Sequence, residues 1–468
     1  MIVKNEAHNL GRCLASLRGA VDEVVVVDTG SSDDTIQVAR SGGARVFEFP
    51  WCDDFSAARN ESLRLASGDW LIWIDADEEL VEAIPGALRT ICRQLPASYQ
   101  GCWIPSHSLS NEEGEVGIVA RQWRLLRNHA GIRFSGRIHE QLMLPSGGQP
   151  KIAPQDAVHT RHWGYLPKGD VLRRKAERNL RLLELAISEE PANPQHYFNL
   201  GLQHSFARDF EPALAAFRRA IELWRRSPSA AGWVPGMFSS AAFVAVNLQR
   251  YDVALDVEER TPPEYVSTDL VYFAGIACWR TGRVDDAVAR LRRAATDRAI
   301  LHEELHPQST STWRPRAGLA GIYDRLQQYD VAYQHARDAL ALAPDHPELL
   351  FGAADLADKV GRTDEALDLV RQLLAGERDF GYKQHGRRLM LQLAERLGSA
   401  ELTLEALASG AAYQVSERDS LYAQARAHAH LGARAQALAL LEQACRRFPH
   451  DQQLGRALLE ARAGAWQG

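Results

Sequence analysis

Two carboxylates one residue apart are the strongest sign of chemistry in this sequence. Asp75 and Asp77 directly follow the apolar residues 70–74, and Glu78 comes next. Carboxylates spaced in this way on a tight turn present their oxygens to one point, which suits a hard divalent cation such as Mg²⁺ or Mn²⁺. The same cation can bridge a substrate diphosphate. A structural alternative remains, because acidic residues also favour the first turn of a helix.

A second acidic motif ends another apolar run. Residues 24–27 are four consecutive valines, and Asp28 follows them ahead of Gly30 and Ser31. Gly30 permits a tight turn at the end of a strand, and an acidic side chain there can hold a base or ribose. Ordinary capping between a strand and a helix explains the same residues equally well.

A third motif occupies residues 51–60, which read Trp-Cys-Asp-Asp-Phe-Ser-Ala-Ala-Arg-Asn. Aromatic and acidic residues that lead into Arg59 and Asn60 at the start of a helix are unusual for a loop with a structural role alone. Arg59 can either pair with a phosphate or orient an aspartate.

Alternating strands and helices are expected to position these motifs. Residues 24–27, 44–49 and 70–74 read as strands, and residues 7–20 and 33–41 carry helical patterns. This order predicts an α/β domain with a doubly wound, mostly parallel sheet. Ligands bind such sheets at the carboxyl ends of the strands, which is where the acidic motifs stand.

The chain changes character from about residue 168, where strand signals end and Ala, Leu and Arg dominate. Ala332 and Ala366 stand 34 residues apart, the tetratricopeptide period. Two other gaps in this series are about twice as long and leave room for a degenerate repeat. We expect about six helical pairs stacked into a solenoid, with a capping helix over residues 451–466. The alanines assigned to the second helix of a pair are Ala213, Ala287, Ala332, Ala366 and Ala437.

The composition is that of an ordinary globular protein. Of 468 residues, 46% are hydrophobic and 24% charged, which excludes a mostly disordered chain. The net charge of −6 gives no bulk attraction to nucleic acid, so no nucleic-acid partner is expected. None of the six cysteines forms a CxxC pair, which favours buried thiols in a reducing compartment.

The sequence also bears on location and on the first strand. No apolar run approaches the length of a membrane span, and residues 1–6 hold no apolar signal core. We therefore expect a cytoplasmic protein. Only residues 1–3 precede a polar stretch, so the first strand is either stunted or begins upstream.

Taken together and in this order, the motifs resemble the GT-A fold of family 2 glycosyltransferases. More specifically, they are similar to the subgroup in which such a domain is fused to tetratricopeptide repeats. The resemblance implies a GT-A domain over residues 1–167, a connecting helix over 168–192 and a tetratricopeptide-repeat domain over 193–468. The segments that carry it are Lys4-Asn5-Glu6, Asp28-Thr29-Gly30-Ser31, Asp53-Asp54-Phe55-Ser56, Arg59-Asn60 and Asp75-Ala76-Asp77-Glu78.

The resemblance implies a nucleotide-sugar donor, most often UDP-linked. Asp28 would contact its nucleobase or ribose, with Asn5 and Glu6 beside the same pocket, and Arg59 would help hold the nucleotide end. Arg121, Arg124 and Arg127 recur at helix-like spacing. Of these three, Arg124 is the preferred phosphate contact, and a solvated basic face is the alternative.

A divalent metal, Mn or Mg, is implied as cofactor. Asp75 would face the ribose and metal, and Asp77 would bind the metal directly. The stretch His162-Trp163-Gly164-Tyr165 looks like the late histidine element that completes such a site, with His162 as ligand. Residues 302–306, His-Glu-Glu-Leu-His, also have conceivable metal spacing, but an irregular loop between repeats is the preferred interpretation.

Family 2 members invert anomeric configuration and so need a general base near the acceptor. The stretch Gly136-Arg137-Ile138-His139-Glu140 looks like the acceptor-side motif. His139 or Glu140 could take the proton, and Glu140 is preferred because inverting enzymes of this fold usually use a carboxylate. The structural alternative is that His139 and Glu140 form a surface pair.

The sequence therefore predicts an inverting, metal-dependent glycosyltransferase. The donor would be UDP-GlcNAc or UDP-glucose, and the acceptor a Ser, Thr or Cys side chain of a polypeptide held by the repeats. One alternative is a transferase for cell-surface polysaccharide or lipid-linked glycan. The other is a non-catalytic repeat scaffold. Neither the sugar nor the acceptor can be read from the sequence.

Overall fold

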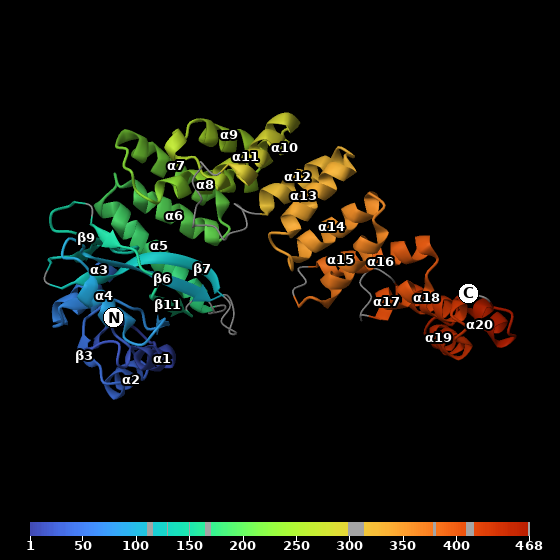
Figure 1. Ribbon diagram of the computed structural model, residues 1–468, viewed down its shortest axis with the longest axis horizontal. Helices are drawn as coiled ribbons and strands as arrows, with labels where there is room; N and C mark the ends of the chain where they lie inside the picture. Colours follow the sequence, from blue (N-terminus) through green and yellow to red (C-terminus); the bar gives the residue numbers. More distant parts are fainter. Residues whose placement is uncertain are drawn as a thin grey trace. The chain divides into compact units, whose positions relative to one another are not determined.

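The computed structural model describes residues 1–109, 116–128, 130–148, 150–163, 170–297, 313–377, 381–408 and 416–466. The chain divides into two compact units, Met1–Val257 and Glu258–Gly468. The first unit holds the strands and several helices, and the second is helical (Figure 1). An α/β domain followed by an all-α repeat region is thus confirmed. The 302–306 group and residues 164–165 lie outside the described residues.

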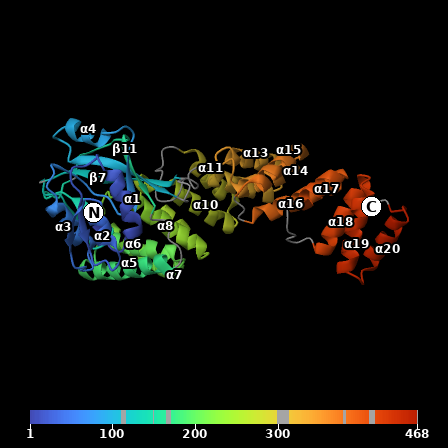
Figure 2. The same cartoon turned by 90° about the horizontal axis from the view of Figure 1, so that it is seen from below.

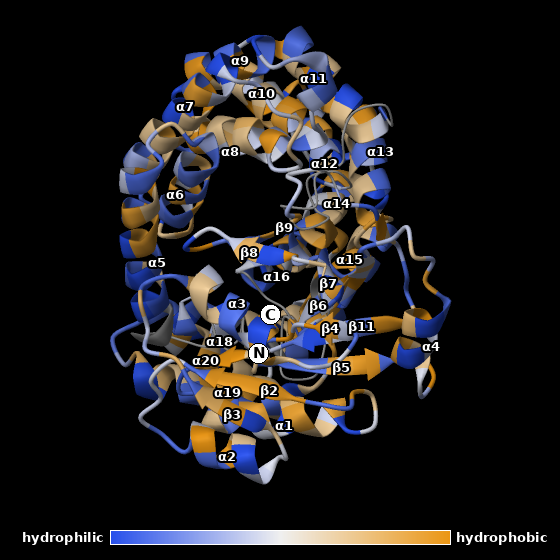
Figure 3. Ribbon diagram, turned by 90° about the vertical axis from the view of Figure 1, so that its left-hand side faces the viewer, coloured by the Kyte–Doolittle hydropathy of each residue, from blue (hydrophilic) through white to orange (hydrophobic). Residues whose placement is uncertain are grey.

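The N-terminal strands form a small parallel sheet in the order β1-β2-β3. All four residues of β2 are buried, as expected for a β-branched strand covered on both faces, and Figure 3 shows its hydrophobic colouring. The elements are β1 (Ile2–Val3), α1 (Ala7–Leu17), β2 (Val25–Asp28), α2 (Thr35–Ser41) and β3 (Arg45–Glu48).

A second, mixed sheet has the order β4-β7-β6-β11-β5, with β10 paired to β6. The two sheets share one hydrophobic core, which includes Leu10, Val26 and Ile104. The remaining elements of this part are α3 (Phe55–Leu65), β4 (Trp70–Ile72), β5 (Glu78–Glu82), α4 (Ala87–Gln94), β6 (Gly101–Leu109), β7 (Val116–Arg127), β8 (Arg133–Ser135), β9 (Gln141–Met143), β10 (Ile152–Ala153) and β11 (Val158–His162).

Two local expectations are wrong. The acidic turn at residues 75–78 leads into strand β5, not into a helix, so helix capping does not explain its carboxylates. Arg121, Arg124 and Arg127 lie on strand β7 and therefore do not share a helical face.

Four helices follow within the first unit, and a fifth, α9, begins there and ends just past its boundary. Helix α5 does more than connect, because Leu182 and Leu183 on it form a buried cluster with Ile138 of the β8–β9 hairpin. In α6, a Cβ on Gly201 would come 2.5 Å from Cε1 of Phe217, so only glycine lets α6 approach α7 this closely. The helices are α5 (Asp170–Glu189), α6 (Pro194–Phe206), α7 (Phe210–Arg226), α8 (Val234–Asn247) and α9 (Tyr251–Glu259).

The second unit stacks consecutive helices, as Figure 2 shows. Each second helix packs on its first helix and on the next pair, which is how solenoid repeats bury their faces. Its helices are η1 (Pro263–Tyr265), α10 (Thr268–Arg280), α11 (Val284–Thr296), α12 (Arg314–Arg325), α13 (Tyr329–Leu340), α14 (Pro347–Lys359), α15 (Thr363–Ala375), α16 (Tyr382–Leu397), α17 (Ala400–Ala408), α18 (Glu417–His430), α19 (Arg434–Arg447) and α20 (Gln452–Arg462).

The alanine spacing identified the second helices correctly. Ala213, Ala287, Ala332, Ala366 and Ala437 lie in α7, α11, α13, α15 and α19, and all five are buried. The two long gaps hold α9 and α17, which fill the places left for degenerate repeats. Helix α20 stands where the capping helix was expected.

Candidate active site

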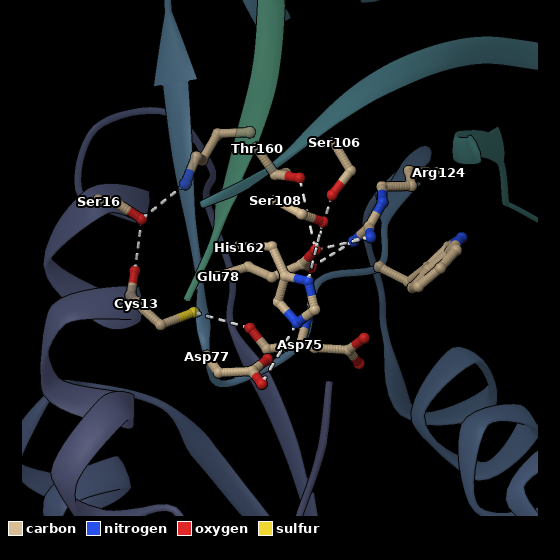
Figure 4. Close-up of polar contacts among 12 residues, drawn as sticks. Cys13, Ser16, Asp75, Asp77, Glu78, Ser106, Ser108, Arg124, Thr160 and His162 are labelled. Atoms are coloured by element: carbon tan, nitrogen blue, oxygen red, sulfur yellow. Dashed lines mark hydrogen bonds and ion pairs between the residues drawn. The ribbon is translucent and has the colours of Figure 1, made fainter. Parts of the chain in front are cut away.

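The acidic turn after β4 is fixed by its own backbone and by neighbouring strands. The amide of Asp75 donates to Oε2 of Glu78 at 3.0 Å, and the Glu78 amide donates back to the Asp75 carbonyl at 3.1 Å. The Trp163 amide donates to the Asp77 carbonyl at 3.0 Å, and the Cys13 thiol to that of Asp75 at 3.5 Å. Figure 4 shows this turn. The turn therefore holds two carboxylates in a fixed geometry.

Glu78 is the buried centre beneath the turn, and sequence reasoning did not single it out. Its carboxylate forms a two-point ion pair with Arg124, whose Nη2 lies 2.7 Å from Oε1. Ser106 and Thr160 donate to the same oxygen at 3.3 and 3.5 Å. The signal that could have found it is its place in the acidic turn, three residues after Asp75. The buried ion pair between Glu78 and Arg124 thus anchors the acidic turn.

Arg124 does not suit the role first assigned to it. Strand β7 has a bulge where Leu125 pairs with Cys102 and Trp123 with Trp103, which leaves Arg124 as the extra residue. Its side chain turns inward, lies 4.2 Å from the Trp73 ring centroid and is 3% exposed. Both a phosphate contact and a solvated basic face are inconsistent with this burial. Arg124 instead neutralises Glu78.

Asp77 and His162 come together at the edge of the turn, as the sequence predicted. Oδ2 of Asp77 lies 3.4 Å from Nε2 of His162, and Ser108 Oγ lies 3.5 Å from Nδ1 (Figure 4). Burial opposes the charged imidazole, but the hydrogen bond and charge of Asp77 outweigh it and raise the pKa of His162. A carboxylate beside an imidazole is a donor pair that Mn²⁺ accepts.

These two side chains do not make a complete metal cage. Among the described residues, no group of three or more His, Cys, Asp or Glu side chains is arranged to hold a metal ion. A cation at Asp77 and His162 would therefore take further ligands from water and substrate, as Mg²⁺ does when it bridges phosphates. The residues present fit a metal that binds together with its substrate.

Arg59 of α3 connects the two halves of the site. Its guanidinium donates to Oδ1 of Asp75 at 3.0 Å and forms a second ion pair with Glu140. The ring centroids of Trp73 and Phe134 lie 4.7 and 5.5 Å from it. Burial would raise the pKa of Asp75, but the charge of Arg59 outweighs it and lowers that pKa. Of the two roles open from the sequence, Arg59 here orients an aspartate.

The β8–β9 hairpin brings Glu140 to Arg59, and His139 precedes Glu140 in the chain. The side chain of Asn60 fastens the hairpin to α3, because it bonds both the amide and the carbonyl of Phe134, at 2.8 and 2.9 Å. His139 has a φ of 54° and is exposed, and desolvation lowers its pKa. The Glu140 side chain is 12% exposed and pairs with Arg59, so it does not form a surface pair with His139.

Asp28 sits in the loop after β2. Its Oδ2 accepts hydrogen bonds from the amides of Gly30 and Ser31 at 3.0 Å each. Its Oδ1 is buried and has no hydrogen-bond partner among the described residues. Since a buried acceptor without a partner is costly, Asp28 keeps one oxygen for a group from outside the chain.

Asn5 and Glu6 lie at the end of β1 beside this loop. The Asn5 Oδ1 accepts from the Ser32 amide at 2.7 Å, so Asn5 holds the loop in place. Burial raises the pKa of Glu6, and the nearby charge of Asp77 adds to this effect. Glu6 is therefore close enough to Asp77 for the two charges to interact.

A cavity of about 770 Å³ lies elsewhere in the first unit. Val25, Trp70 and Leu71, at the amino ends of β2 and β4, are among its lining residues. None of the residues predicted for the site lines it. The carboxyl-end site and this cavity are therefore separate features.

The fold and this site define an α/β domain, with an acidic site at the strand ends, joined to helical repeats. The family model of glycosyl transferase family 2 matches residues 1–130, and a tetratricopeptide repeat model matches residues 325–384. The chain therefore carries a family 2 glycosyltransferase domain at its N-terminus and tetratricopeptide repeats towards its C-terminus.

The relatives are named either for tetratricopeptide repeats or for glycosyltransferase activity. A TPR repeat-containing protein of Synechococcus elongatus is 29% identical over 74% of this chain and 75% of its own length. The glycosyltransferase SunS of Bacillus subtilis is 25% identical over 58% of this chain, and the match spans 64% of SunS. An uncharacterized glycosyltransferase of Rickettsia felis is 38% identical over 19% of this chain and 32% of its own.

Solved structures resemble this chain only weakly. The crystal structure of YrrB, titled a TPR protein with an unusual peptide-binding site, covers 44% of this chain and 97% of its own. The identity is 18% and the TM-score 0.31, a likeness too slight to bear on function.

No described helix is both long and apolar enough to cross a membrane.

Proposed function

We propose that this chain is an inverting, metal-dependent glycosyltransferase. It would move GlcNAc or glucose from a UDP-sugar to a Ser, Thr or Cys side chain of a polypeptide held by the repeats, in the cytoplasm. The observation that carries the proposal is the Arg59 bridge between Asp75 and Glu140, next to the Asp77–His162 pair. This bridge joins the acidic turn, which suits the nucleotide-sugar donor, to the carboxylate of Glu140, which suits the acceptor substrate.

In this proposal each residue has a distinct task. The free oxygen of Asp28 accepts a hydrogen bond from the base or ribose, and Asn5 and Glu6 shape that end of the pocket. Asp77 and His162 would hold a divalent cation, which would supply Lewis acidity to the departing diphosphate.

The acceptor side is assigned to the hairpin. Glu140 is positioned by its ion pair with Arg59 and takes the proton from the attacking hydroxyl or thiol. His139 is the other candidate base, because an imidazole with a lowered pKa is neutral at pH 7 and can accept a proton. Variants at each position separate the two.

The decisive experiment is transfer from a panel of nucleotide-sugars. Purified protein is incubated with each donor, MnCl₂ and lysate of the host, followed by intact-mass analysis of proteins and by analysis of the lipid fraction. A sugar mass on a protein, lost with EDTA and with Asp77→Asn, is the expected result. Label in lipid alone would reject the polypeptide acceptor, and no transfer or hydrolysis with any donor would favour a scaffold.

A further inference from the structure

Helix α5 is fastened along the candidate site by the very motifs that build the site. Arg137 Nε of the acceptor-side motif lies 2.6 Å from Glu189 Oε2 on α5. Arg181 Nη2 on α5 lies 2.6 Å from Asp53 Oδ1 of the aromatic–acidic motif. Together with the buried Ile138 cluster, these contacts set the direction of α5 across the β8–β9 hairpin.

Two cationic side chains of α5 face the site from this fixed position. Arg178 is half-buried, and its guanidinium lies 5.0 Å from the ring centroid of Phe55. It is close enough to Glu140 for the two charges to interact. Lys175, nearly one turn earlier, is likewise close enough to Glu6 for the two charges to interact. The charge of Asp77 also acts on Glu6. Lys175 thus stands towards Glu6, and Arg178 stands towards Glu140.

The charge of Arg178 is poorly compensated. Its side-chain hydrogen bonds, at 2.8 and 3.2 Å, go to the neutral amide oxygen of Asn179, and no described carboxylate lies within ion-pair distance of it. Burial lowers the pKa of Arg178, against a smaller opposing effect of Glu140. A half-buried guanidinium in such a setting favours an anion from outside the chain.

We propose that Arg178, assisted by Lys175, binds the diphosphate of the nucleotide-sugar donor. Helix α5 then forms a wall of the donor site and is not only a link to the repeats. The inference rests on the proposed function, because it assumes a donor that carries a diphosphate. Arg guanidinium suits phosphate oxygens because it can donate two parallel hydrogen bonds.

The test measures binding of UDP, uridine and inorganic pyrophosphate to the full chain by calorimetry with MnCl₂ present. Arg178→Ala should weaken UDP and pyrophosphate about tenfold or more and leave uridine unchanged. Lys175→Ala should have a smaller effect in the same direction, and Arg178→Lys should recover part of the loss. Arg174→Ala, an exposed position on the same helix, is the matched control.

The outcomes separate this inference from the function on which it rests. If the unaltered chain binds no UDP, both fail. If it binds UDP and Arg178→Ala binds it equally well, only the inference fails. Equal loss of UDP and uridine would mean that the variant disturbs the fold, and a raised acceptor KM with normal UDP binding would assign Arg178 to the acceptor. Either result overturns the inference.

Discussion

Arg59 and Glu140 form an ion pair across 81 residues of sequence. Arg59 lies in the first two turns of α3, and Glu140 stands between the two strands of the β8–β9 hairpin. The same guanidinium also pairs with Asp75 in the acidic turn after β4. The Arg59 side chain therefore sets the distance between the two carboxylates. In the proposed reaction, Asp75 lies on the side of the sugar donor and Glu140 on the side of the acceptor.

Arg59→Ala should lower UDP-sugar hydrolysis and transfer by about a hundredfold or more. It releases both carboxylates at once, and misplacement of about 1 Å is enough for such a loss. Arg59→Lys should not restore activity, because an ammonium cannot reproduce the planar fork. Arg64→Ala, whose side chain is 67% exposed on the same helix, should be near normal. Normal turnover in Arg59→Ala would disprove the positioning role.

Glu78→Gln should destabilise the first unit by about 3–5 kcal/mol, because it leaves Arg124 buried without its counter-charge. The side chains of this pair are 1% and 3% exposed. Arg121→Ala breaks the exposed pair with Asp156 and should cost less than about 1 kcal/mol. Urea unfolding followed by tryptophan fluorescence measures both. Similar costs for the two variants would contradict the central role of Glu78.

His139 should make stability depend on pH below neutrality. Because desolvation lowers its folded pKa, the unfolded chain takes up a proton near pH 6.5 more readily than the folded chain. The free energy of unfolding therefore keeps the contribution of neutral His139 above pH 6.5 and loses it as the pH falls. His139 is exposed, so solvent screens this effect, and His139→Asn, which tolerates the positive φ, should show only a slightly flatter pH dependence than the unaltered chain between pH 7 and 5.5. Parallel unfolding profiles would contradict the assignment.

Gly201→Ala should destabilise the first repeat pair by about 1–3 kcal/mol, because the added methyl overlaps the Phe217 ring. Gly321→Ala provides the control. It also lies inside a helix, but nothing stands within 4 Å of its Cβ position, so the change should stabilise by about 0.5–1 kcal/mol. Thermal unfolding by circular dichroism compares the two. Equal effects would mean that close helix approach does not matter at Gly201.

Local patterns were enough to find most elements. The valine run gave β2, the apolar run before Asp75 gave β4, and the alanine spacing gave the second helices of the repeats. These succeed because strand and helix periods are written in neighbouring residues. The arginine series failed because a spacing of three also fits a bulged strand, where the local pleat decides which way each side chain points.

The sequence by itself determined the class of the protein and which residue types meet. A carboxylate turn at a strand end, an acidic loop and a histidine near the end of the domain are all local features, and the predicted Asp77–His162 pair forms. Only the tertiary structure decided the partners. It paired Arg124 with Glu78 in the interior, gave Arg59 to Asp75 and Glu140, and laid the cations of α5 beside the site. The physical reason is that a charge's role depends on its burial and on the nearest opposite charge, and both come from segments far apart in the chain.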